Sequence, residues 1–319
     1  MASIDAILDP AHRDLLDSAI RNVLGTERAL ETFAQIADGL PLSSVARDGY
    51  ARRAPYANHP AVARHMSLCP GATEAALGFL SELSLGRTLT FDKALLRAYQ
   101  WTQPGSGRSF ECRLIELMAR AVHGLAVLLF QRGHRIHDVV WAAKDPTYTV
   151  NAVTRPNPDA QLGPSPFCHP EYAMTDQYPD GVADVVGYWA ENRILGGVVL
   201  LDRSDSWDDQ RNPEPNVFLH SSYYDITFRV WRALDEQQQA LVDFLLSRSP
   251  AGACPFPLLA SDKNLDRIDP QYATSLKVCR DFWERRLPPS NGRFQESHCV
   301  RSQLDYPEAY PKPSHKEWL

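Results

Sequence analysis

The sequence predicts an α+β protein, in which a helical N-terminal half packs on a four-stranded antiparallel meander that is followed by C-terminal helices. Apolar residues recur at helical spacing through about residues 1–142, whereas runs rich in β-branched and aromatic residues dominate from residue 181 onward. With 319 residues, of which 44% are hydrophobic, the chain can bury a core without disulfides or metals. We therefore expect a single domain over residues 1–319.

Helices account for most of the first half. Asp9-Pro10 begins one that ends at Gly25, because an aspartate cap followed by proline is a typical helix start. Further helices are expected near 26–37, 72–84, 90–101 (capped by Thr90) and 109–132. The last of these is apolar around most of its circumference, which indicates a buried element. Its polar residues fall in one narrow stripe: Arg113, Glu116, Arg120, His123 and Gln131.

Residues 143–180 form an irregular seam between the two halves. Prolines crowd this stretch and no periodicity runs through it. Its aromatic residues need a place to pack, so we expect a seam within one core and not a flexible linker. These residues are Tyr148, Phe167, Tyr172 and Tyr178.

The β-meander and the C-terminal helices are expected within residues 181–319. Two apolar runs, 182–191 and 194–202, predict a hairpin that turns at Asn192, and 217–220 and 226–232 predict a second strand pair. A helix follows from Asp235, with Gln238 three residues on as in a capping box. A last helix is expected near 273–286.

Charge and cysteine usage exclude several classes of protein. The 33 basic and 39 acidic residues give a net charge of −6, which argues against nucleic acid and against an anionic membrane surface as partners. The apolar stretch 114–130 contains Glu116, Arg120 and His123, so we do not expect it to span a membrane. The cysteines are scattered and no secretory leader is recognisable, which favours reduced thiols and a cytoplasmic location. A homodimer is left open.

Familiar cofactor motifs are incomplete. The loop 104–109 resembles a phosphate loop but lacks the Gly-Lys-Ser/Thr ending. We therefore interpret it as a loop that leads into the following helix. His134 and His137 have the spacing of a metal-binding pair, but no third ligand is recognisable near them. An acidic run follows in an expected loop: Asp202, Asp205, Asp208 and Asp209. A solvated loop explains it better than a magnesium site. We expect no metal and no cofactor.

Polar groups inside apolar surroundings are the best candidates for a site. An aromatic pocket with a few convergent polar groups is the usual form of a small-molecule site. The candidate catalytic residues are His220, Tyr188 and Arg229. The candidate substrate-binding residues are Glu116, His123, Trp189, Glu191, Tyr224 and Trp231. The alternative is structural: an ion-pair ladder on the helix, and aromatic core residues with satisfied polar tips.

Several segments resemble a group of filamentous-fungal proteins that accompany natural-product pathways. The segments are 178–184, 187–197, 110–117 and 227–231. Proteins of this kind include cofactor-free cyclases, among them a norbornene-forming Diels–Alderase of terpene biosynthesis. The resemblance implies a cofactor-independent cyclase or isomerase acting on an apolar terpenoid or polyketide, with a [4+2] cycloaddition as one candidate reaction.

Two other functions remain open from the sequence. One is non-catalytic binding of a small molecule or a protein through the same aromatic surface, and the other is a metal-dependent hydrolase or oxygenase built on the scattered histidines. The cyclase hypothesis requires the hairpin around 187–201 and the helix after Ser109 to enclose a dry hollow.

Overall fold

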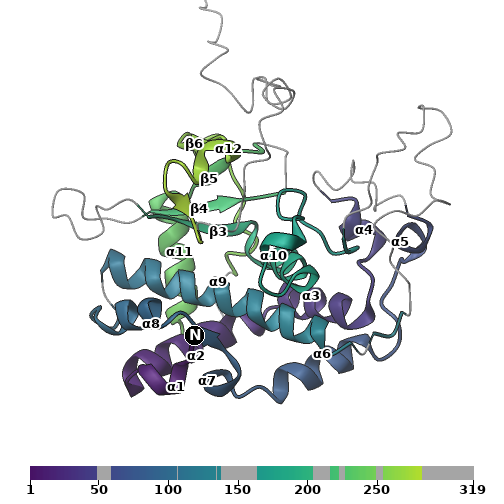
Figure 1. The fold of residues 1–319 in the computed structure, drawn as a ribbon, viewed down its shortest axis with the longest axis horizontal. Coiled ribbons are helices and arrows are strands. Elements are labelled where there is room, and N and C mark those ends of the chain that lie inside the picture. Colours follow the sequence, from purple (N-terminus) through teal and green to yellow (C-terminus); the bar gives the residue numbers. More distant parts are fainter. Residues whose placement is uncertain are drawn as a thin grey trace, which may run out of the picture.

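The computed structural model describes residues 1–48, 59–105, 107–133, 135–137, 164–203, 216–222, 227–248 and 254–281. Helices form the lower layer of the molecule and a small sheet lies above them (Figure 1). The helices of the N-terminal half are α1 (Ile4–Ile7), α2 (Pro10–Leu24), α3 (Glu27–Asp38), α4 (Ser43–Ala46), α5 (Pro60–Arg64), α6 (Ala72–Ser81), α7 (Leu85–Thr88), α8 (Lys93–Gln100) and α9 (Arg108–Gln131). A two-stranded ladder joins β1 (Ala2–Ser3) to β2 (Thr90–Phe91).

Local signals explain the ends of the first helices. The side chain of Asp9 accepts a hydrogen bond from the backbone of His12 at 3.0 Å, and Pro10 occupies the first turn of α2. The side chain of Thr26 caps α3 in the same way, and Gly39 ends that helix at φ +99°. The cap of α8 is Asp92 and not Thr90, which instead pairs with Ser3 in the small ladder.

The expected strand 182–191 is wrong, because these residues belong to helix α10 (Val182–Leu195). Every residue from Ala183 to Leu195 is buried, so the helix has no solvent-facing stripe. Without such a stripe, an apolar run rich in β-branched residues has the same pattern as a strand buried on both faces. The expected turn at Asn192 is therefore absent as well, and the helix ends at Gly196 with φ +100°.

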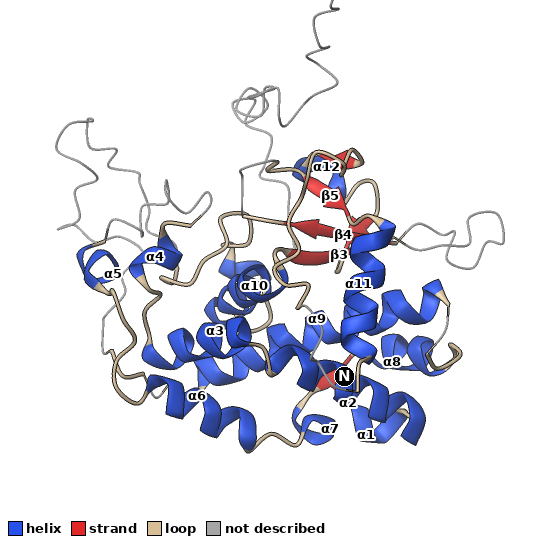
Figure 2. Cartoon of the chain, turned by 180° about the vertical axis from the view of Figure 1, so that it is seen from behind, coloured by secondary structure: helices blue, strands red, loops and turns tan. Residues whose placement is uncertain are grey.

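The sheet has five antiparallel strands in the order β6-β5-β4-β3-β7, and not the four expected. They are β3 (Val198–Asp202), β4 (Val217–His220), β5 (Val230–Arg232), β6 (Arg267–Ile268) and β7 (Val278–Cys279). The α+β class is confirmed, with β4 at its expected place. Helix α11 (Asp235–Leu246) stands beside the sheet when the molecule is seen from behind (Figure 2).

The C-terminal helices differ from the expectation in two respects. The backbone N–H of Leu234 donates to Oε1 of Gln237 at 3.0 Å, so Gln237 and not Gln238 closes the start of α11. The helix expected over 273–286 is replaced by the short α12 (Pro270–Ala273) and by β7. Between these two elements Lys277 adopts φ +60°, a left-handed conformation that ends the helical path. Residues 282–286 lie outside the described part.

Two apolar clusters hold the elements together. The larger one surrounds α9 and includes one face of the sheet, with Val199, Leu219 and Trp231. The smaller one lies on the opposite face, where Val198, Leu200 and Phe218 meet Tyr188 of α10. Phe167, Tyr172 and Tyr178 of the seam are buried in these clusters, as their size requires. Both faces of the sheet are therefore covered.

Helix α9 is long and apolar enough to cross a membrane if only length and composition are considered. Most of its apolar stretch is nevertheless buried inside the protein. This is typical of the central helix of a soluble protein.

Candidate functional site

The polar stripe of α9 faces α10 and the sheet. His123 lies between two carboxylates of α10: its Nε2 is 2.9 Å from Oδ1 of Asp184, and its Nδ1 is 2.8 Å from Oε1 of Glu191. Ionised carboxylates only accept hydrogen bonds, so this arrangement suits an imidazolium that donates from both ring nitrogens.

Helical spacing on α10 positions the groups that meet His123. Asp184, Tyr188 and Glu191 are separated by four and three residues, so they share one face of the helix. Gly187 lies among them, and a Cβ at this position would come within 2.7 Å of the His123 ring. The glycine therefore allows the imidazole to approach the helix backbone.

Arg280 completes the charges around Glu191. Its Nη1 is 2.5 Å from Oε1 of Glu191, and its guanidinium lies over the ring of Tyr188, 5.0 Å from the centroid. Burial alone would raise the pKa of Glu191, but the charge of Arg280 and the hydrogen bond from His123 outweigh it and lower the pKa. Glu191 is thus ionised although it is fully buried.

A second ion-pair group continues along α9. Glu116 accepts from Nε of Arg120 at 3.1 Å and from Nη2 of Arg203 at 2.5 Å. Arg120 also makes a bidentate pair with Asp281, at 3.0 and 3.1 Å. Burial would raise the pKa of Glu116, but the charges of Arg120 and Arg203 lower it. Arg203 Nη2 donates to the backbone oxygen of Arg280 at 2.8 Å, which joins this group to the first one.

A chain of aromatic rings extends from His123 to the sheet. The ring of Tyr188 contacts His123 edge-on at 4.6 Å between centroids and stacks on Tyr172 at 4.5 Å. The hydroxyl of Tyr172 is 3.1 Å from Nδ1 of His220, at the end of β4. His169 also packs against Tyr172 and His220. We call the ion pairs and these rings together the α9–α10 network.

The structure brings five of the predicted residues into this network: Glu116, His123, Tyr188, Glu191 and His220. Trp231 lies on the face of the sheet that contributes to the larger apolar cluster, opposite the face that meets Tyr188. Trp189 packs on Phe167 within the same larger cluster. Arg229 precedes β5, half-buried, and its backbone N–H donates to Oγ1 of Thr227. Tyr224 lies outside the described residues, as do His134, Asp205, Asp208 and Asp209.

Sequence reasoning missed the partners from other segments: Tyr172, Asp184, Arg203, Arg280 and Asp281. A signal was present for Asp184, because its spacing from Tyr188 and Glu191 is helical and matches the polar stripe on α9. No comparable signal exists for Arg203 and Arg280, which come from the ends of β3 and β7 and approach α9 only through sheet pairing.

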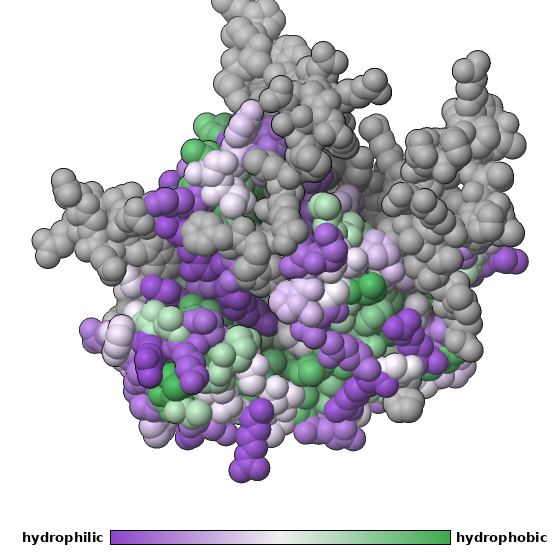
Figure 3. Space-filling view, in the orientation of Figure 1, coloured by the Kyte–Doolittle hydropathy of each residue, from purple (hydrophilic) through white to green (hydrophobic). Residues whose placement is uncertain are grey.

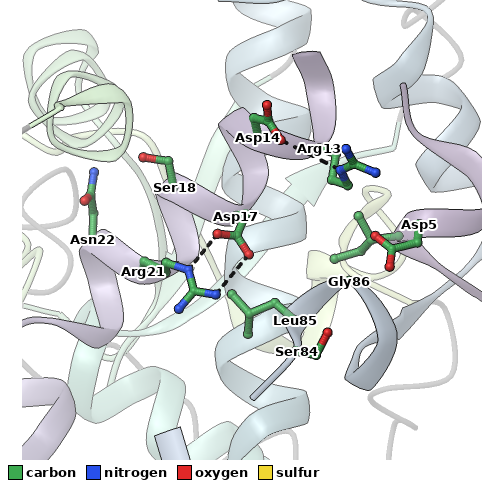
Figure 4. A pocket seen from close by; sticks show the side chains of 11 residues that line it. Asp5, Arg13, Asp14, Asp17, Ser18, Arg21, Asn22, Ser84, Leu85 and Gly86 are labelled. Atoms are coloured by element: carbon green, nitrogen blue, oxygen red, sulfur yellow. Dashed lines mark hydrogen bonds and ion pairs between the residues drawn. The ribbon is translucent and has the colours of Figure 1, made fainter. Parts of the chain in front are cut away.

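Three cavities that described residues line lie away from this network. The largest of these three, about 580 Å³, lies between α1, α2 and α7 (Figure 4). Its wall carries the charged residues Asp5, Arg13, Asp14, Asp17 and Arg21, which do not suit an apolar ligand. Helices α9 and α10 pack directly on each other, and none of these three cavities lies between them. None of the three is therefore the dry hollow expected at this place.

Hydrophilic residues nevertheless gather on the face that joins the sheet to the helices (Figure 3). The side chains of His123 and Asp184 keep 12% and 10% of their surface exposed, and that of Arg203 keeps 19%. One edge of the network is therefore within reach of a small molecule.

A separate cluster among the described residues has the composition of a metal site: Asp38, His65, Cys69 and His137. It shares no residue with the α9–α10 network.

No family model matches the chain, and neither the curated proteins nor the solved structures include a significant match to it.

Proposed function

We propose that this protein is a cofactor-independent cyclase or isomerase of fungal secondary metabolism that acts on an apolar terpenoid or polyketide. An intramolecular [4+2] cycloaddition is the specific reaction that we propose. The resemblance of segments 110–117, 178–184, 187–197 and 227–231 to fungal natural-product proteins supports this choice.

The observation that carries the proposal is the imidazole of His123, held between Asp184 and Glu191 at a partly exposed edge. Buried ionisable groups with shifted pKa values cluster at functional sites more often than elsewhere. A purely structural ion-pair network would have the same contacts, and an activity assay distinguishes it from a catalytic site.

In this proposal the protein holds a flexible substrate in its reactive conformation, which lowers the entropic part of the barrier before any bond forms. The positive charges of His123 and Arg280 stabilise electron density that builds on a carbonyl oxygen of the substrate. Tyr188 and His220 are almost fully buried, at 1% and 0% exposure, so they orient the network from behind. Such a reaction moves no electrons to or from a cofactor.

The proposal places the protein in the cytoplasm, with an apolar small molecule as its partner. Cys69 and Cys254 carry free thiols, which is compatible with a reducing compartment.

The test uses purified full-length protein without added cofactor and a panel of linear polyenes that carry a diene and an activated alkene. Formation of cyclised product is followed by chromatography and mass spectrometry against the spontaneous rate. We expect acceleration, and a loss of about tenfold or more in Asp184→Asn, because the imidazolium loses one of its two carboxylate partners. Asp14→Asn, an equal change at a side chain that is 77% exposed, is the control.

Equal rates with and without protein across the panel would contradict the proposal. Binding of a polyene without turnover would instead assign a non-catalytic binding protein.

A further inference from the structure

We propose that Asp38, His65, Cys69 and His137 bind one Zn²⁺ ion, which fastens three separate segments of the chain. Each residue offers one ligand atom, and these atoms all lie within 4.8 Å of one another. This inference does not depend on the proposed function, because it rests on different residues.

Three segments supply the ligands. Asp38 is the last residue of α3, His65 follows α5, Cys69 lies between α5 and α6, and His137 follows α9. The backbone N–H of His137 donates to the oxygen of Asp38 at 2.7 Å, so the third segment runs alongside the end of α3. Gly39 makes this approach feasible, since a Cβ there would lie only 3.0 Å from the oxygen of His137.

The distances between the polar atoms are close to those around a tetrahedral metal, with the two to Asp38 shorter. Oδ1 of Asp38 is 2.7 Å from Nδ1 of His137, and Oδ2 is 3.1 Å from Nε2 of His65. Sγ of Cys69 is 3.5 Å from Nδ1 and 3.7 Å from Nε2 of His137. Ligands of tetrahedral zinc lie about 3.3–3.8 Å apart, given metal–ligand bonds of roughly 2.0–2.3 Å. Small adjustments of the side chains therefore suffice.

The hydrogen bonds around His65 select its ligand atom. Nδ1 lies 3.0 Å from the carbonyl oxygen of Pro41, which can only accept, so Nδ1 carries the proton. Nε2 faces Oδ2 of Asp38 at 3.1 Å, so it is the nitrogen that offers a lone pair to a metal ion between the two residues. A metal-bound histidine typically donates its other N–H to a carbonyl in this manner.

Asp38 is supported in the same way. Its carboxylate is fully buried, and Oδ2 accepts the backbone N–H of Cys69 at 2.9 Å. The rings of His65 and His137 lie edge-on to each other beside this carboxylate, with centroids 4.8 Å apart. One Zn²⁺ with one carboxylate and one thiolate forms a neutral site, which removes the cost of a buried net charge.

The donor set favours zinc over other metals. Two imidazoles, one thiolate and one carboxylate are typical zinc ligands, whereas Mg²⁺ and Ca²⁺ prefer oxygen alone. Four protein ligands leave no open coordination position, so the site is structural and not that of a hydrolase. His137 keeps 29% of its side chain exposed, which provides a path for the ion.

Elemental analysis of the full-length protein, purified without chelator, tests the inference. We expect about one zinc per chain in the wild type and in Cys254→Ser, which removes an exposed cysteine elsewhere. We expect less than a tenth of that in Cys69→Ser and in His137→Gln. His137 keeps more of its side chain exposed than His65 and Asp38, so its variant is well able to keep the fold, which circular dichroism checks.

Cobalt provides a readout that a merely structural role of these side chains would not produce. Co²⁺ added to metal-stripped protein should give the visible absorption of a tetrahedral site and a thiolate-to-cobalt charge-transfer band, and the band should vanish in Cys69→Ser. The proposal would be overturned if the wild-type protein contained no zinc and its cobalt form lacked this band. Equal metal content in the wild type and in all variants would overturn it as well.

Discussion

The imidazole of His123 lies directly against the backbone of Gly187, where a Cβ would approach the ring atoms to 2.7 Å. Both nitrogens of the ring are held by carboxylates of α10, so the ring cannot turn away without breaking a buried hydrogen bond. The close packing of α9 on α10 therefore depends on a residue without a side chain.

Gly187→Ala should lower the free energy of unfolding by about 1–3 kcal/mol, because overpacking here displaces a tethered ring. Gly78→Ala in α6 is the matched control, since a Cβ there meets nothing within 4 Å. That variant should raise stability by about 0.5–1 kcal/mol through helix propensity alone. Urea unfolding of both variants checks the prediction, and stabilisation by both would contradict the packing argument.

Acid should destabilise the protein through the buried carboxylates. The pKa values of Glu116, Glu191 and Asp281 are lowered in the folded state, chiefly because arginine charges outweigh the effect of burial. The unfolded chain then binds more protons than the folded one as the pH falls below about 5. The stabilisation is therefore present above the unfolded values and is lost as the pH falls toward the folded ones.

Urea midpoints between pH 7 and pH 3 measure this dependence, with Glu191→Gln as the informative variant. We expect it to cost about 3–5 kcal/mol at pH 7, since Arg280 and His123 lose a charged partner, and to flatten the acid limb. Glu74→Gln, at an exposed position of α6, should change neither the stability at pH 7 nor its loss in acid. Stability of the wild type that rises on acidification would show that Glu191 is buried in its neutral form.

The side chain of Asn22 on α2 closes the end of α11. Its Nδ2 donates to the carbonyl oxygens of Phe244, Leu245 and Ser247 at 3.1, 3.1 and 2.9 Å. These residues lie at the C-terminal end of α11, where a helix offers no further backbone N–H groups to its last carbonyls, and the backbone N–H of Ser247 donates to the carbonyl oxygen of Phe244 at 3.3 Å. Asn22→Asp keeps the shape but directs a carboxylate at three acceptors, so it should lower the free energy of unfolding by about 1–3 kcal/mol at pH 7.

Thermal unfolding of Asn22→Asp at two pH values separates this effect from a change in packing. Its deficit relative to wild type should shrink at acidic pH, where a protonated carboxyl donates one hydrogen bond. A deficit that does not change with pH would argue against the capping role.

Cysteine reactivity should follow burial. Burial raises the pKa of the Cys112 and Cys168 thiols to about 12, whereas Cys254 is exposed. Since the thiolate is the reactive form, iodoacetamide at pH 8 should modify Cys254 at least about a hundredfold faster than either buried thiol. Peptide mapping by mass spectrometry measures the rates, and similar rates in native protein would contradict the described burial. Urea should remove the difference.

Local signals in the sequence determined much of the helical half. The Asp9-Pro10 start, the Thr26 cap and the glycines at 25 and 39 act within one or two turns, so they can be interpreted without knowledge of distant residues. The apolar circumference of α9 likewise predicted its burial. The candidate residues on α9 were correctly expected to lie side by side, because helical spacing alone sets their relation.

Only the tertiary structure decided the conformation of residues 182–195 and the contacts between distant polar residues. Residues 182–195 are apolar on every side, so their own pattern does not distinguish a helix from a strand, and packing between α9 and the sheet selects the helix. The contacts of His123 with Arg280, and of Asp38 with Cys69 and His137, are made between residues 31 to 157 positions apart in the sequence. Such contacts arise when elements pack against one another, and no short stretch of sequence encodes them.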